Sequence, residues 1–119
     1  MANPNLYNTS TITGRTALSA VGTGATTLVS NPAASGKVLK VNSVIIANID
    51  GTNAADITAD VYRNSTAFRF ASTVSVPADT SIILLSKDNS LYLQEGDDLR
   101  LTASASGDLV GTVSFEEIG

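Results

Sequence analysis

Short segments of alternating apolar and polar residues recur along this chain. In Ile57–Tyr62 and Asp98–Ala103, every second residue is aliphatic, and the residues between are polar or charged. A period of two places the aliphatic side chains on one face of a β-strand and the polar ones on the other. No long stretch has the i, i+3, i+4, i+7 apolar spacing of an amphipathic helix. The pattern therefore predicts an all-β protein.

Nine such segments are predicted to be strands, separated by turns rich in Gly, Pro, Asn and Asp. They are Ala17–Val21, Thr26–Ser30, Val38–Ile49, Ile57–Arg63, Ala67–Val76, Ser81–Leu85, Leu91–Leu93, Leu99–Ala105 and Val110–Glu117. Strands this closely spaced leave no room for crossover helices and favour a single-domain antiparallel β-sandwich or jelly roll over residues 16–119.

Residues 1–15 are polar, contain Pro4 and show no sustained period, so they are predicted to form an extended N-terminal arm. Leu6 and Tyr7 are its candidate anchors on another molecule. At about 3.3 Å per residue, an extended arm of this length would reach on the order of 50 Å. A frayed terminus without partners is the alternative.

The chain contains neither cysteine nor histidine. Disulfides, thiolate nucleophiles, imidazole bases and the usual zinc or iron ligand sets are therefore excluded. A net charge of -4 disfavours a phosphate-binding surface, so nucleic acid is not an expected partner. No apolar run approaches the roughly 18 residues of a membrane span, and the N-terminus lacks a secretory pattern, so no membrane association is expected.

The connection that contains Asp50, Asn53 and Asp56 is the most site-like segment of the sequence. Its oxygen-bearing residues lack the alternating spacing and the final bidentate acid of an EF-hand loop, so weak calcium binding is the lesser alternative. Asp-Gly is favourable turn chemistry, because Gly51 accepts a positive φ and the Asp and Asn side chains can satisfy nearby backbone groups. The segment is interpreted as a bend between two strands.

A second acidic group, Glu95-Gly96-Asp97, lies between two short strands. It is predicted to be a tight turn in which Gly96 takes a positive φ and the acids keep the corner in solvent. A glycosidase pair of Glu95 with Asp97 or Asp98 would need an aromatic-lined sugar cleft, but only 5% of the residues are aromatic. No catalytic residue, cofactor or metal ligand is assigned.

The segment YRNSTAFRFAS is predicted to form a hairpin at Asn64-Ser65. Phe68 and Phe70 would share one strand face and are interpreted as core rings, with Arg69 on the opposite face. Arginine and aromatic residues concentrate in protein contacts, which makes an interface the competing interpretation. Together with the arm anchors, the candidate interface residues are Leu6, Tyr7, Tyr62, Arg63 and Arg69.

The chain contains the segments SGKVLKVNSVIIANIDGTNAADITADVYR, ASTVSVPADTSIILLSKDNSLYLQEGDDLRLTASASGDL and VSFEEI. These three segments resemble small virion structural proteins of tailed phages, especially of cyanophages. The resemblance spans roughly Ser35 to Ile118. It implies a non-enzymatic β module, either a capsid decoration (cement) subunit or a tail, neck or fibre component. The implied partners are the major capsid protein or other virion proteins. The resemblance also implies that the protein forms a homotrimer on the capsid surface and that the virion is assembled in the host cytoplasm.

A carbohydrate-binding module at a tail tip is the alternative. It would need an exposed aromatic platform, for which Tyr7, Tyr62 and Tyr92 are the candidates.

Overall fold

The computed structural model describes Leu6 and residues 11–119. In this part of the chain, nine strands and one 3-10 turn make up the regular structure. They are β1 (Ile12–Ala20), β2 (Thr26–Ser30), β3 (Val38–Asn48), β4 (Ala55–Arg63), β5 (Thr66–Val76), β6 (Ser81–Leu85), η1 (Lys87–Asn89), β7 (Leu91–Leu93), β8 (Asp98–Ala103) and β9 (Leu109–Ile118). Across these residues, no helix has the length and apolar character to span a membrane.

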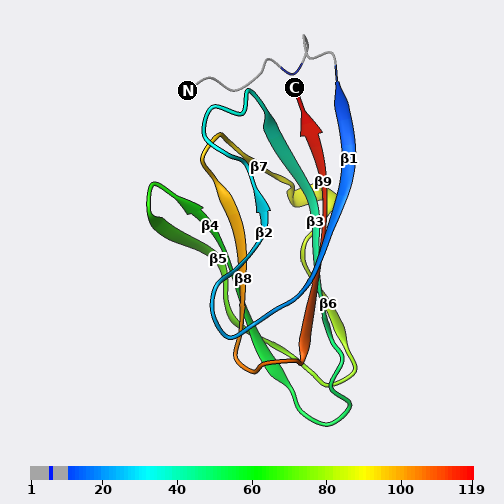
Figure 1. The fold of residues 1–119 in the computed structure, drawn as a ribbon. Helices are drawn as coiled ribbons and strands as arrows, with labels where there is room; N and C mark the ends of the chain where they lie inside the picture. Colours follow the sequence, from blue (N-terminus) through cyan, green and yellow to red (C-terminus); the bar gives the residue numbers. More distant parts are fainter. Residues whose placement is uncertain (1–5, 7–10) are drawn as a thin grey trace.

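The strands form two antiparallel sheets that face each other (Figure 1). Sheet I has the order β1-β9-β3-β6, with β7 also paired to β3, and sheet II has the order β2-β8-β4-β5. The first and last strands are neighbours, because β1 pairs with β9 along its whole length. The predicted all-β sandwich in a single domain is confirmed.

A strand is present at each of the nine predicted positions. The largest difference is at β1, which begins at Ile12 although the sequence pattern indicated Ala17. β1 is an edge strand that is exposed along most of its length, so it lacks the apolar alternation of a half-buried strand. Residues 12–15, assigned to the arm from the sequence, therefore pair with β9. The remainder of the predicted arm, apart from Leu6 and Thr11, lies outside the described residues.

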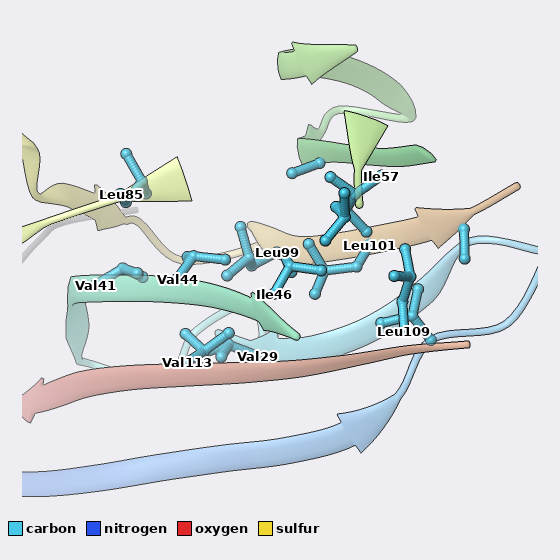
Figure 2. Close-up of a cluster of buried hydrophobic side chains, with 14 of the residues drawn as sticks. Val29, Val41, Val44, Ile46, Ile57, Leu85, Leu99, Leu101, Leu109 and Val113 are labelled. Carbon is cyan, nitrogen blue, oxygen red and sulfur yellow. The ribbon is translucent and has the colours of Figure 1, made fainter. Parts of the chain in front are cut away.

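The core lies between the sheets and consists of aliphatic side chains. Figure 2 shows Val44 and Ile46 of β3 close to Leu99 and Leu101 of β8, and all four are fully buried. Burial of each such side chain contributes about 1.5–3 kcal/mol. The contact between the two layers is therefore the main source of stability.

Gly111 of β9 faces sheet II at a point where side chains of that sheet leave no room for a Cβ. A Cβ on this residue would lie 2.6 Å from Leu101 Cδ1 and 3.1 Å from Leu28 Cδ2, both in sheet II. Nonbonded carbon atoms prefer a separation of about 3.5–4.0 Å. Gly111 is therefore required by the space between the sheets and not by its φ, which is not positive.

Asp60 of β4 does not follow the predicted alternation of buried and exposed residues. The pattern placed it on the wetter face with Tyr62, but only 4% of Asp60 is exposed. Arg100 of β8 covers it, since Arg100 Nε donates a hydrogen bond to Asp60 Oδ1 at 3.0 Å. The Arg100 guanidinium carbon also lies 3.9 Å from the centre of the Tyr62 ring. A partner on the neighbouring strand thus buries a charge that a single-strand pattern assigns to solvent.

The two acids in the turn between β7 and β8 are also buried, so the prediction that they keep the corner in solvent is wrong. Gly96 has the predicted positive φ, 89°. Glu95 and Asp97, however, are only 7% and 1% exposed. The loop before β3 covers Glu95, whose Oε2 accepts a hydrogen bond from the Gly36 N–H at 2.6 Å, and Arg63 covers Asp97.

Two buried asparagines, which the sequence pattern did not indicate, hold the connections at the two ends of β3. Asn31 Nδ2 donates to the backbone carbonyls of Lys37 and Leu93 at 2.9 and 3.0 Å. Asn48 Nδ2 similarly donates to carbonyls just before β4 and at the end of β5, at 3.0 and 2.9 Å. Each side-chain amide thereby joins segments that are distant in the sequence.

Candidate functional site

A pocket of about 310 Å³ lies between the β4–β5 hairpin and β7. It is lined by Val61 and Arg63 of β4, Phe68 of β5, and Leu91 and Tyr92 of β7, and we call it the hairpin pocket. Phe68 and Tyr92 are 57% and 42% exposed. Concave surfaces with apolar walls and exposed aromatic rings are typical of binding sites.

The pocket forms because the hairpin end of sheet II is not covered by sheet I. Asn64 and Ser65 have φ values of 52° and 59°, the two positive angles of a type I′ turn, and the hairpin predicted at these residues is confirmed. On the other side, sheet I has only the three-residue strand β7. Figure 1 shows the β4–β5 hairpin end standing away from β7.

Phe68 consequently does not belong to the core, and the prediction that it does is wrong. It pairs with Val61 across the hairpin and faces the pocket. Phe70 packs against the core as predicted. The difference arises because a strand pattern gives the side to which a residue points, whereas the opposite sheet determines whether that side is covered.

A bidentate ion pair with Asp97 holds Arg63 at the pocket. Its Nε and Nη2 donate to Asp97 Oδ1 and Oδ2 at 2.7 and 2.6 Å. The hydrogen bond to Asp97 raises the pKa of Arg63, which therefore stays charged. A guanidinium has five N–H donors, and the ion pair with Asp97 uses two of them, so three remain to bind a partner. The Arg63 side chain is 41% exposed, which makes it accessible to that partner.

The interface residues predicted from the sequence do not lie on one surface of the structure. Tyr62 and Arg69 share the outer face of sheet II, whereas Arg63 points to the pocket side. Arg69 is exposed and forms no ion pair with the described residues. Leu6 is 47% exposed, and Tyr7 lies outside the described residues. Sequence reasoning missed Phe68 and, for a protein interface, Tyr92.

The Asp50 connection is built as a turn. Asp50 Oδ1 accepts hydrogen bonds from the backbone N–H groups of Thr52 and Asn53 at 2.8 and 3.3 Å, and the bond from Thr52 is the main cause that lowers the pKa of Asp50. The Asp50 side chain thus satisfies nearby backbone groups as expected, and Gly51 does not take the positive φ that a glycine accepts. Among the described residues, no three acidic side chains gather as a metal site would require.

No protein-family model and no curated protein matches the chain. Solved structures do share its fold. A chain of the acid-stable capsid structure of Helicobacter pylori bacteriophage KHP30 matches 93% of this chain and 90% of its own length, with a TM-score of 0.53 and 10% identity. A chain of the Bacillus endospore appendages, described as a novel family of disulfide-linked pili, matches 91% and 88%, with a TM-score of 0.52 and 15% identity.

The likeness is one of fold. Identities of 10% and 15% do not transfer function, because one fold hosts many unrelated functions. A pentameric capsid protein from metagenomic phage sequences has a TM-score of 0.42, which is too low to support an argument.

Proposed function

We propose that the chain is a non-enzymatic structural subunit of a phage virion. The observation that carries this proposal is the hairpin pocket, an apolar hollow with two exposed aromatic rings at the open end of a β-sandwich. The fold is shared with a chain of a phage capsid and with a pilus subunit chain, both taken from protein assemblies. Because the chain has no cysteine, its contacts in such an assembly would not be disulfide-linked.

Within this class we infer a capsid decoration (cement) subunit that binds the major capsid protein or other virion proteins, as a homotrimer on the capsid surface. The strand orders of the two sheets support the finer prediction of a jelly roll, in which the chain passes repeatedly from one sheet to the other. Many copies of a small rigid domain, each making modest contacts, add up through multivalency. Tail, neck or fibre association is the alternative within the class.

The hairpin pocket would receive an apolar side chain of the partner protein. Phe68 and Tyr92 supply the apolar walls, and the free N–H groups of Arg63 can donate to a carbonyl or carboxylate beside that side chain. Aromatic residues and arginine carry a large share of the binding energy in protein interfaces. Arg69 lies on the same hairpin but on the opposite face, so it would contact a different surface.

The first test compares phage particles with and without this protein. Particles that lack it should still assemble but release their genome at a lower temperature. Equal heat resistance would argue against cementing and in favour of host attachment. The position of the chain in an image reconstruction of the intact particle would decide between head and tail.

The second test uses purified variants added back to particles that lack the protein. Phe68→Ser and Tyr92→Ser should each reduce binding at least tenfold. Val74→Ser is the matched control, because Val74 is a 38% exposed apolar residue of β5 outside the pocket. Arg69→Glu tests the outer face separately, and unchanged association would remove Arg69 from the interface. Full binding by both pocket variants would contradict the role proposed for the pocket.

Carbohydrate binding is the second candidate, because half-exposed Tyr92 provides an aromatic surface at the pocket. Sugars also require several hydrogen-bonding groups, and among the lining residues only Arg63 and Tyr92 carry polar side-chain groups. A protein partner is therefore favoured. Binding to a glycan array that disappears in Tyr92→Ala would reverse this preference.

A further inference from the structure

The outer face of sheet I carries a row of residues that is unusual for a surface in contact with water. Leu18 of β1 pairs with Thr112 of β9, Thr112 with Ile45 of β3, and Ile45 with Ile83 of β6. Leu18 and Ile83, at the two ends of the row, are 69% and 67% exposed. On a half-solvated antiparallel sheet these positions are ordinarily polar.

The neighbouring rows are also free of charge. The row from Ala20 across to Ser81 and the row from Thr16 across to Ser43 contain only alanine, valine, serine and threonine. We call these three rows the uncharged band. The core residues Val44 and Val113 alternate with band residues along β3 and β9, so the band points away from sheet II.

We propose that the uncharged band is a contact surface for a second copy of this chain, formed face to face around a two-fold axis. Each copy carries a net charge of -4, so long-range electrostatic repulsion opposes the association of two copies. The band lets them approach without opposing charges. An isologous contact also needs a self-complementary surface, and an uncharged face of aliphatic, serine and threonine side chains meets that requirement because it opposes no like charges.

The size of the face indicates how strong this contact can be. The three rows of the band cover about 20 Å along four strands that are about 4.8 Å apart, which is on the order of 380 Å² per copy, or about 770 Å² for a pair. Specific stable interfaces bury about 1,200–2,000 Å² in total. The contact is thus weak between isolated molecules and becomes effective where many copies are held side by side, so in the proposed virion assembly it would join neighbouring oligomers.

Analytical ultracentrifugation of the full chain over a range of concentrations tests the proposal. The protein should form dimers at high concentration, and Leu18→Glu or Ile83→Glu should weaken the association at least tenfold. Thr27→Glu is the control, since Thr27 is exposed on sheet II. A protein that stays monomeric up to about 1 mM, or an equal loss in the control, would overturn the second copy as the occupant and indicate a different partner.

Cross-linking gives a second readout, because the chain has no native cysteine. Leu18→Cys and Ile83→Cys, alone and mixed, should form disulfide-linked dimers under mild oxidation, whereas Thr27→Cys should not. Dimers from the single variants indicate a two-fold axis along the row, and dimers from the mixture alone indicate an axis along the strands. If no band variant cross-links faster than Thr27→Cys, the contact does not exist, and the proposal for the hairpin pocket is unaffected.

Discussion

Replacement of Gly111 by alanine tests whether the two sheets are held at the separation that the structure shows. The new Cβ would lie 2.6 Å from Leu101 Cδ1, about 1 Å closer than a normal carbon contact. Leu101 is fully buried, so its side chain has little room to move away, and the partly buried Leu28 has its Cδ2 3.1 Å from the same point. Forcing an extra methyl group into a packed core costs about 1–3 kcal/mol.

Urea denaturation followed by circular dichroism measures this loss. With a slope of about 1.5 kcal/mol per molar urea, the midpoint should fall by roughly 0.7–2 M. A thermal melt should shift downward by roughly 4–12 °C, at about 4 °C per kcal/mol for a chain of this size.

Gly14→Ala is the matched control. Gly14 is also a strand residue of sheet I, has no positive φ, and would have no atom within 4 Å of a new Cβ. Its stability should change by no more than about 0.5 kcal/mol. Leu101→Val in the Gly111→Ala background should cost at least about 0.5 kcal/mol less than the sum of the single changes, because it removes the clashing atom. An unchanged midpoint for Gly111→Ala, or an equal fall for Gly14→Ala, would refute the reasoning.

Three further predictions concern polar groups. Arg63→Met should cost about 2–4 kcal/mol in urea denaturation and Asp97→Asn clearly less, because the first change leaves the 1% exposed Asp97 carboxylate without its charged partner. The second leaves only the 41% exposed Arg63 side chain, which water can solvate, so equal losses would contradict this. Asn31→Ala should cost about 2–3 kcal/mol, because it removes the side-chain donor to one buried and one partly buried backbone carbonyl. A loss under about 0.5 kcal/mol would show that water replaces the amide. The hydrogen bond from Lys37 lowers the pKa of Glu117 below 4.5, so the stability that ionised Glu117 contributes is present above pH 4.5 and is lost as the pH falls through the lowered pKa. The wild type should therefore lose more stability than Glu117→Gln between about pH 5 and pH 3. Parallel curves of stability against pH would argue against the Lys37–Glu117 pair.

Local pattern was a good guide to the strands that face the core. Leu99, Leu101 and Ala103 alternate in the sequence and are all buried in β8, because one face of that strand lies against sheet I. The hairpin turn at Asn64-Ser65 and the positive φ of Gly96 were also predictable, since both depend on a few consecutive residues. β1 was the exception, because an edge strand takes its register from β9, about 100 residues away.

The candidate site was less predictable than the fold. Arg63 was singled out for its residue type, but its pairing with Asp97 joins β4 to the turn between β7 and β8. Phe68 was assigned to the core, and Tyr92 was considered only as a sugar platform. The hairpin pocket depends on how far β4 and β5 extend beyond β7. The local sequence of one strand does not determine that distance, because it depends on how the two sheets pack.

The sequence by itself determined that this protein is a sandwich of aliphatic β-strands without thiol or imidazole chemistry, because strand period and residue type are local properties. Only the tertiary structure decided which acids are buried, which aromatic rings stay exposed, and that Leu18 and Ile83 lie in one row. Burial and juxtaposition depend on what another strand places opposite a side chain, and that strand is most often distant in the sequence.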